Sequence, residues 1–366
     1  MALKLTGTMQ NYAWGHERFI ADVQGREPSG KPEAELWFGA HPSAPSQTPE
    51  GPLDEVIARE GTHSLPFLVK LLAAAKPLSL QAHPSREQAR AGFARENAAG
   101  IALDAPERNY KDANHKPEIL IALTPFRAMA GFRPIDQTLE LLAAFDLPEL
   151  ADLEHVLSDA SLNESDRLSR ALTMAMNSGE SVVRAVDKRA RELKNREGCA
   201  GEVAENLQFI AREYPGDSGV VAAMLLNHVA LEPGEAIFLS AGNLHAYLYG
   251  LGVEVMANSD NVLRGGLTAK HIDAAELFSV LTFEPLDNPK ATAFGGRFEV
   301  PVDDFCVAAL AQGAVVSGPA IVLNTAGQLT VGDITLRAGE AAWISPAENR
   351  LAVSGEGAAA FAVTQG

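Results

Sequence analysis

The sequence predicts a mainly β fold with a helical insertion, on the basis of three observations. Short apolar runs between turn residues fill residues 1–134, helical periodicity replaces them over 135–229, and strand patterning returns from residue 230. The returning segment also contains an internal repeat. Apolar residues that alternate with a period of two are typical of strands, and those three or four apart are typical of helices. We therefore expect two related barrel or jelly-roll units and one all-α domain.

Strands are predicted first at PFLVKLL (66–72) and EILIAL (118–123), which are apolar runs bounded by turn residues. A helix is predicted between them. Ser85 and Gln88 form a capping-box pattern in front of REQARAGFARENA (86–98). The expected helix therefore starts directly after Ser85.

The stretch LSLQAHPS (78–85) alternates apolar and polar residues. Successive side chains of a strand point to opposite faces, so Ser79, Gln81 and His83 are expected on one face. An ordinary solvent-facing strand has the same pattern. The pattern alone therefore indicates a strand, and it leaves the role of the polar face open.

Five amphipathic helices are predicted in the second segment. Their sequences are DQTLELLAAF (136–145), SDRLSRALTMAMN (165–177), SVVRAVDKRARELKN (181–195), GEVAENLQFIAREY (201–214) and SGVVAAMLLNHVA (218–230). They contain few candidate catalytic groups, so we interpret this insertion as a scaffold or lid.

The segment PGEAIFLSAGNLHAYL (233–248) aligns without a gap with AGEAAWISPAENRLAV (338–353). Each copy predicts a glycine turn, an apolar strand, a second turn and another strand. His245 falls opposite Arg350, so if this position held a metal-binding histidine, the second copy has lost it. One unit is then expected to be active and the other structural. The predicted domains are a catalytic unit in two parts (1–134 and 230–285), the helical insertion (135–229) and a degenerate C-terminal unit (286–366).

Composition limits the function. The formal net charge is −17, which argues against binding to nucleic acid or to anionic membranes. No apolar run approaches the ~20 residues that span a bilayer, and the start MALKLTGTMQNYAWG lacks the apolar core of a secretion signal. Cys199 and Cys306 form no pair pattern, which suits a reducing cytosol. We expect a cytoplasmic monomer.

Several compact motifs are absent from the sequence. It contains no HExxH, CxxC or EF-hand spacing, no GxxxxGK[ST], no GxGxxG after a strand and no GxSxG. These absences argue against a kinase, a dehydrogenase or a serine hydrolase. Any metal site must therefore be assembled from distant residues.

A dispersed set of metal-ligand types remains. Gln81 and His83 share one expected strand face, Glu118 opens a hydrophobic run, and His245 lies at a turn between two strands. Two histidines and one glutamate recur as ligands of catalytic zinc, and a glutamine oxygen is an unusual but chemically reasonable fourth ligand. For each histidine the alternative is a hydrogen-bonded residue in a core or a turn.

The densest polar stretch is GVEVMANSDNVLRGGLTAKHID (252–273), which contains Glu254, Asp260, Arg264 and Lys270. Arg264 and Lys270 provide the local positive charge that a phosphorylated substrate requires in an acidic protein. A solvated loop with ordinary surface charges is the alternative.

Together these segments resemble the type I mannose-6-phosphate isomerase (phosphomannose isomerase) family. Residues 1–285 follow the family order and the β-rich tail resembles its C-terminal domain. The matching segments are NYAWG (11–15), AELWFGAHPSAPS (34–46), PFLVKLL, LSLQAHPS, DANHKPEILIALTPFRAMAGFRP (112–134) and HAYLYGLGVEVMANSDNVLRGGLTAKHID (245–273). The resemblance implies cupin-like jelly rolls and a zinc-dependent aldose–ketose isomerase that interconverts mannose 6-phosphate and fructose 6-phosphate. This sequence departs from the family pattern at two places. The stretch SAGNLHAYL lacks the proline that the family usually has before this histidine, and RGGLTAK stands where the family usually has RAGLTPK.

The resemblance also implies site residues. One zinc ion per chain is expected on Gln81, His83, Glu118 and His245. The implied pocket residues are Trp14, Glu35, Lys70, Ser79, Lys116, Glu254, Asp260, Arg264 and Lys270.

We expect a cis-enediol mechanism in which one base moves a proton between C2 and C1. Arg264 is expected to stabilise charge beside the enediolate, while Lys270, Lys70 and Ser79 are candidates for binding the phosphate or sugar hydroxyls. The candidate bases are Asp260, Glu254, Lys116 and His115. Two alternatives stay open: a non-catalytic cupin-like sugar-phosphate-binding protein, and a cupin dioxygenase, which would favour a redox metal and more histidine ligands.

Overall fold

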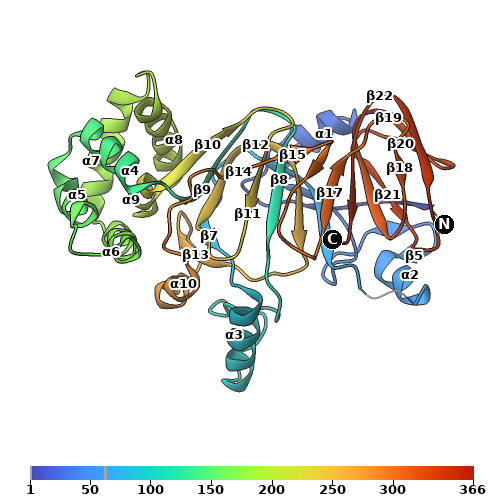
Figure 1. Cartoon of the computed structure of the whole chain (residues 1–366), viewed down its shortest axis with the longest axis horizontal. Helices are drawn as coiled ribbons and strands as arrows, with labels where there is room; N and C mark the ends of the chain where they lie inside the picture. The colour runs from blue at the N-terminus through green and yellow to red at the C-terminus, as the bar shows by residue number, and fades with distance from the viewer. Residues whose placement is uncertain (1, 62–63) are drawn as a thin grey trace.

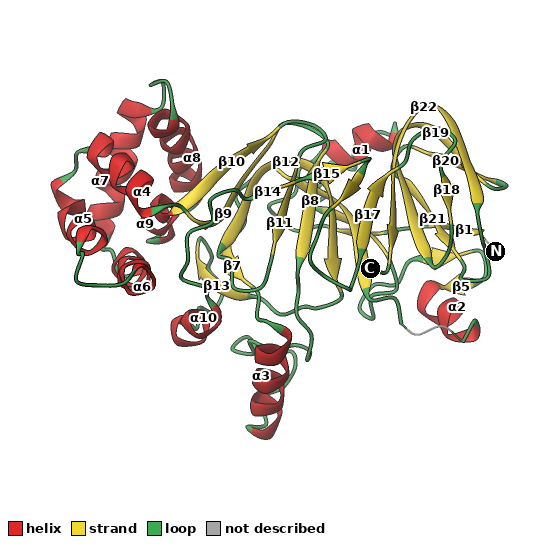
Figure 2. Cartoon of the chain, in the orientation of Figure 1, coloured by secondary structure: helices red, strands yellow, loops and turns green. Residues whose placement is uncertain are grey.

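Two large β-sheets form most of the protein, as Figures 1 and 2 show for this computed structural model, which describes residues 2–61 and 64–366. One sheet has eleven strands and the other has nine. A group of helices lies beyond the free end of the eleven-stranded sheet, and α3 projects from its lower edge (Figure 1). The expectation of a mainly β protein with helices is therefore confirmed.

The elements follow one another in three groups. The first group is β1 (Ala2–Leu5), β2 (Thr8–Gln10), α1 (Phe19–Gln24), β3 (Glu35–Phe38), β4 (Gln47–Thr48), β5 (Gly51–Pro52), α2 (Leu53–Arg59), β6 (Phe67–Ala74), β7 (Leu80–Ala82), α3 (Arg86–Ala98), β8 (Glu118–Ala122) and β9 (Phe126–Phe132). The second group is α4 (Ile135–Phe145), η1 (Pro148–Leu150), α5 (Ala151–Ser158), α6 (Glu164–Met176), α7 (Glu180–Leu193), α8 (Cys199–Glu213), α9 (Gly219–Ala222) and η2 (Ala223–Leu225). The third group is β10 (Leu226–Leu231), β11 (Ala236–Leu239), β12 (His245–Ala257), β13 (Leu263–Gly266), α10 (Ala274–Val280), β14 (Lys290–Ala291), β15 (Ala293–Phe294), β16 (Arg297–Phe298), β17 (Cys306–Ala309), β18 (Val315–Val316), β19 (Ala320–Val331), β20 (Ile334–Arg337), β21 (Glu340–Ile344) and β22 (Leu351–Thr364).

The two repeat copies occupy equivalent places in the two sheets. The eleven-stranded sheet contains the order β11-β8-β12-β6, and the nine-stranded sheet contains β21-β19-β22-β17. In the first copy β8 lies between the repeat strands β11 and β12, and in the second copy β19 lies between the repeat strands β21 and β22. Gly234 and Gly339 open the copies with φ of 92° and 75°, a left-handed conformation that glycine adopts without steric cost.

The sheets pack against each other through a shared apolar core. Leu36 and Val69 of the first sheet and Ile321 and Trp343 of the second are buried in one cluster. The N-terminal strand β1 pairs with β21, so it belongs to the nine-stranded sheet that otherwise forms from the C-terminal part of the chain. Burial of this shared surface joins the two ends of the chain.

The predicted helix over 86–98 is confirmed. The Ser85 side chain accepts a hydrogen bond from the Gln88 backbone, and the Gln88 side chain accepts one from the Ser85 backbone. This reciprocal bonding satisfies two backbone donors that a helix start leaves unpaired.

The helical segment buries the stripe that its periodicity predicts. Leu168 and Leu172 of α6 and Val183 and Val186 of α7 lie in one apolar core. Helix α5, however, was not predicted, and the prediction of helix over 218–230 is wrong beyond Leu225.

Strand β10 replaces the last predicted helix because its backbone finds a partner in the sheet. It pairs antiparallel with β9, and Leu226 lies opposite Phe132. The Asn227 side chain also donates to the carbonyl oxygens of Ala130 and Phe132. Tertiary pairing thus overrides a local pattern that suits a helix equally well.

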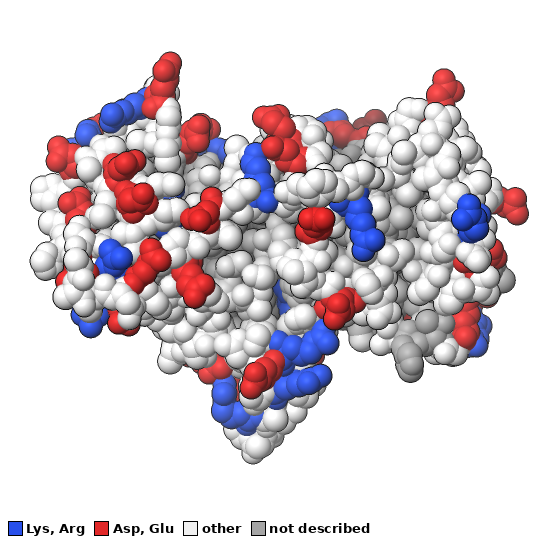
Figure 3. Space-filling model, viewed as in Figure 1, with Lys and Arg blue, Asp and Glu red and all other residues white. Residues whose placement is uncertain are grey.

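Acidic and basic side chains are intermixed on the face shown in Figure 3, and basic ones gather over α3. That helix carries Arg86, Arg90 and Arg95. Among the described residues, no helix combines the length and the apolar character needed to cross a bilayer.

Gly92 is expected to be a sensitive position of α3. A Cβ atom there would lie 2.3 Å from the ring of Tyr110, which is buried. We expect Gly92→Ala to lower the free energy of unfolding by about 1–3 kcal/mol through overpacking. Urea unfolding checks this, and Tyr110→Ala is the matched partner. The loss in the double variant should be clearly smaller than the sum of the two single losses; simple additivity would contradict the explanation.

Candidate active site

Strand register brings the dispersed polar residues together. Gln81 on β7 pairs with His245 at the start of β12 and with Arg264 on β13. On the other side, β12 pairs with β8, where Glu118 lies opposite Met256. Gln81 and Arg264, which are 183 positions apart in the chain, therefore lie on adjacent strands.

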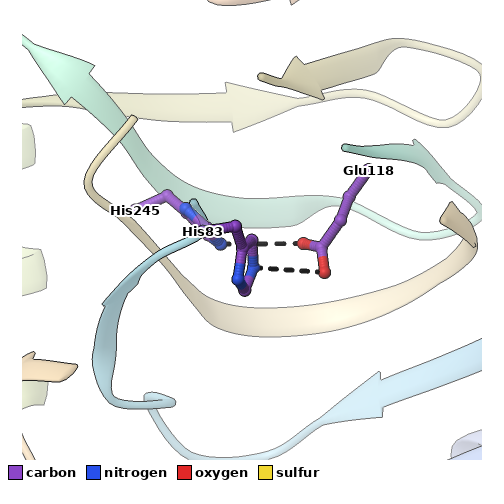
Figure 4. Close-up of side chains that lie close together, drawn as sticks. All are labelled: His83, Glu118 and His245. Carbon is purple, nitrogen blue, oxygen red and sulfur yellow. Dashed lines mark ion pairs between the residues drawn. The ribbon is translucent and has the colours of Figure 1, made fainter. Parts of the chain in front are cut away.

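His83, Glu118 and His245 converge on one point (Figure 4). Nε2 of His83 lies 3.3 Å from Oε1 of Glu118, and Nε2 of His245 lies 3.6 Å from Oε2. All three side chains are at most 2% exposed. Yet Nε2 of each histidine and Oε2 of Glu118 have no hydrogen-bond partner among the described residues. Buried polar atoms without partners are costly, and a cation at their centre would satisfy all three.

Backbone carbonyls orient both imidazoles. Nδ1 of His83 donates to the carbonyl oxygen of Asn261 over 2.8 Å, and Nδ1 of His245 donates to that of Asn243 over 2.9 Å. The proton on Nδ1 leaves the lone pair on Nε2, which faces Glu118. Burial lowers the pKa of His83 to about 4, so this imidazole is neutral near pH 7 and free to bind a metal.

The carboxylate of Glu118 is anionic. Burial acts to raise its pKa, but the positive charge of Lys116 together with the neighbouring His83 and His245 holds the pKa well below its usual range. Nζ of Lys116 lies 3.0 Å from Oε1 of Glu118. Two imidazole nitrogens and one carboxylate suit a borderline divalent cation such as zinc.

A pocket of about 510 Å³ opens beside this centre and contains most of the residues expected from the sequence. Those that line it are Trp14, Glu35, Lys70, Ser79, Gln81, Lys116, Glu118, Glu254, Asp260, Arg264 and Lys270. His83 and His245 lie buried at the adjoining metal-ligand cluster.

Arg264 and Lys270 are the cations of this pocket that lack acidic partners among the described residues. Burial lowers the pKa of both groups, and the charge of Arg264 lowers that of Lys270 further. The half-buried Arg264 and the exposed Lys270 line the same pocket, and like charges there repel each other unless an anion lies between them. This part of the pocket is therefore suited to an anionic group.

Lys70 lies in a buried charge cluster at the pocket wall. Its Nζ is 2.7 Å from Oε2 of Glu254 and 3.5 Å from Oε1 of Glu35. Burial alone would lower the pKa of Lys70, but Glu254 and then Glu35 raise it. Burial raises the pKa of Glu254, while the lysine opposes this shift. Trp37 donates its indole N–H to Glu35, which completes the cluster.

The structure does not bring His115 into the pocket, so its candidacy as a base is corrected. Its Nε2 lies 2.7 Å from Oδ2 of Asp304, and Arg86 contacts both groups. The backbone at Lys116 turns that side chain into the pocket, whereas His115 points toward the nine-stranded sheet's loop at Asp304.

Sequence reasoning missed several residues of the site. Tyr12, His41, Tyr214 and Tyr247 also line the pocket. Tyr214 ends helix α8 and donates its hydroxyl to the carbonyl of Pro77, so the helical segment reaches the site. Tyr12, His41 and Tyr247 lie in segments that carry the family resemblance, which is the signal that could have found them. Tyr214 lies outside those segments.

Two buried imidazoles and a carboxylate beside a pocket with unpaired cations define a metal-dependent enzyme for small anionic substrates.

The family model described as phosphomannose isomerase type I, catalytic domain, matches residues 2–135. The chain is 40% identical to mannose-6-phosphate isomerase of Escherichia coli strain K12, with 97% of each chain covered. It is 33% identical to the human enzyme, covering 83% of this chain and 80% of that one. A solved structure of mannose 6-phosphate isomerase from Salmonella typhimurium, bound to its substrate and to zinc, has a TM-score of 0.87 at 37% identity and covers 100% of this chain and 99% of its own. The chain therefore belongs to the mannose-6-phosphate isomerase family.

The buried charge cluster gives a testable expectation. Lys70→Met would leave Glu35 and Glu254 buried without a counter-charge, so we expect it to lower the free energy of unfolding by about 3–5 kcal/mol. Adding Glu254→Gln should recover part of this loss, because one carboxylate is then neutral. Urea denaturation of both single variants and the double variant checks this. A double variant as unstable as the sum of the single variants would show that the charges act independently.

Proposed function

We propose that the chain is a zinc-dependent aldose–ketose isomerase that interconverts mannose 6-phosphate and fructose 6-phosphate through a cis-enediol intermediate. The observation that carries this proposal is a group of unpartnered metal-ligand atoms beside a pocket with two cations that lack acidic partners among the described residues. A carbonyl compound with a phosphate matches both features. The names of the relatives, and the zinc and substrate in the Salmonella structure, support this reading.

Gln81, His83, Glu118 and His245 would hold one zinc ion per chain. The buried Nε2 and Oε2 atoms that lack partners fit such an ion, and Gln81 lies directly across the strand pair from His245. When bound, zinc supplies Lewis acid chemistry that polarises the sugar carbonyl and stabilises negative charge on oxygen. Because Glu118 is the single anionic ligand, the centre keeps a net positive charge.

The rest of the pocket positions the sugar phosphate. Lys270 and Ser79 bind the phosphate or nearby hydroxyls, and Arg264 stabilises negative charge as it develops on the substrate. Trp14 supplies an apolar wall. Lys70 and Glu35 are engaged in the buried cluster, so their contribution is to fix the shape and charge of the wall.

We assign the proton-moving base to Asp260. Glu254 and Glu118 each contact a lysine. Asp260 does not: among the described residues its ion-pair contact is with His41, whose Nε2 lies 3.5 Å from Oδ1 of Asp260. Burial lowers the pKa of His41, so this neighbour is neutral near pH 7. Asp260 is then a carboxylate without a cationic partner on the pocket wall, free to accept a proton.

The fold and the setting complete the proposal. We interpret the two sheets as cupin-like jelly rolls, a catalytic unit from residues 1–134 and 230–285 and a degenerate unit from residues 286–366. The helical insertion was expected over 135–229, and its last helical residue is Leu225. The helical segment would be an all-α domain. Exposed large apolar side chains such as Leu103 and Phe294 are scattered, which supports a monomer. The unpaired Cys199 and Cys306 support a cytoplasmic setting, and the net charge of −17 argues against nucleic acid or anionic membranes as partners.

The activity assay is the direct test of function. Purified protein should convert mannose 6-phosphate to fructose 6-phosphate in a coupled assay. Removal of the metal with a chelator should lower the rate about a hundredfold or more, because carbonyl polarisation is lost. Added zinc should restore it, and circular dichroism before and after controls for folding. Binding of zinc and sugar phosphate without turnover would instead identify a non-catalytic binding protein.

The assignment of the base is tested by three variants assayed side by side. Asp260→Asn should lower kcat by about 10²–10⁴-fold while KM changes little, since general base catalysis contributes on this order. The variant should also lose incorporation of solvent deuterium at C1 of fructose 6-phosphate. Glu254→Gln and Lys116→Met are the matched comparisons. If one of them abolishes deuterium incorporation and Asp260→Asn retains it, the base is that other residue.

A further inference from the structure

We propose that Asp304, a residue of the C-terminal β-unit, is a positioning residue for the metal centre. It lies between β16 and β17, outside the pocket and far along the chain from every proposed ligand. Its carboxylate connects the two segments that carry His83 and Glu118. The inference rests on the proposed zinc site and extends it to a residue that the resemblance does not imply.

The contacts of Asp304 are short and directed at two different segments. Nη2 of Arg86 donates to Oδ1 over 2.8 Å, and the imidazole Nε2 of His115 lies 2.7 Å from Oδ2. The side chain of Asp304 is only 6% exposed and that of His115 19%, so solvent screens their contact weakly, whereas the 45% exposed Arg86 is screened more. Hydrogen bonds between charged groups are about twice as strong as neutral ones.

The two partners of Asp304 require it in order to approach each other. Nη2 of Arg86 also lies 2.6 Å from Nε2 of His115. A carboxylate only accepts hydrogen bonds, so His115 presents its N–H to Asp304, and a guanidinium nitrogen is likewise a donor. Two donor groups at this distance repel each other. The carboxylate of Asp304 offsets that repulsion by accepting from both.

This arrangement acts on the metal centre through short stretches of backbone. Arg86 opens helix α3, three residues after His83, and His115 stands three residues before Glu118. His83 and Glu118 are 3.3 Å apart at the proposed metal site. Holding Arg86 against His115 therefore fixes the distance between two ligand-bearing segments that come from different parts of the sequence.

Packing and strand pairing hold Asp304 in the C-terminal sheet. Phe305, next to Asp304, is fully buried in the apolar core that joins the two sheets. Strand β17 follows directly and pairs with β22. The unit that lacks the metal-binding histidine thus supplies a fixed carboxylate to the unit that has it. Residues beyond the ligands commonly tune metal affinity in this way.

The test is the zinc affinity of full-length variants, measured by competition with a chromophoric chelator. In Asp304→Asn an amide N–H group takes the place of one carboxylate oxygen, so it faces a hydrogen-bond donor of Arg86 or His115. We expect the zinc dissociation constant to rise about tenfold or more, within the range seen when groups that orient metal ligands are removed. Arg86→Gln, at a partly exposed side chain, removes the same contact from its other end and should weaken zinc binding in the same direction.

Asp303→Asn is the matched control, because Asp303 is exposed and adjacent. It should leave zinc affinity and thermal stability unchanged. If Asp304→Asn and Arg86→Gln lower only the melting temperature and bind zinc as tightly as the unaltered protein, the contact is purely structural and the proposal is wrong. Failure of the unaltered protein itself to bind zinc would instead overturn the proposed function.

Discussion

Antiparallel pairing of the long strand β12 with several neighbours is the constraint on which the site depends. Its start carries His245 and pairs with β7, and its middle carries Glu254 and pairs with β6 and β8. Because side chains alternate along a strand, a slip of one residue would turn His245 away from Glu118. The hydrophobic faces on both sides of this sheet resist such a slip, since it would expose the core.

Charge pairing divides the polar residues of the pocket into two groups. Lys70 and Lys116 contact buried carboxylates, so their charges are balanced within the protein. Arg264 and Lys270 have no acidic partner among the described residues, and their positive charge is left for a ligand. An acidic chain can therefore bind an anionic substrate, because the field inside a partly desolvated pocket is set by near neighbours.

The sequence predicted elements well where local chemistry alone determines them. The capping box at Ser85 and Gln88 specified the start of α3, since both partners are neighbours in the chain. Three of the expected ligand residues, His83, Glu118 and His245, lie together in the fold, and each stands in a segment that carries the family resemblance. Prediction failed where long-range pairing decides: the chain after Leu225 became β10, and His115 turned toward Asp304. Local patterns do not contain the position of the partner in such cases.

The sequence by itself determined the mainly β architecture, the helical insertion, the internal repeat and the presence of side chains of metal-ligand type. Those properties follow from periodicity and from side-chain chemistry, which are local. Tertiary structure alone decided which atoms meet: that Nε2 of both histidines faces Glu118, that Tyr214 of the helical segment reaches the pocket, and that a strand from the N-terminus completes the C-terminal sheet. Strand register and the burial of a shared core set these contacts, and both depend on the whole chain at once.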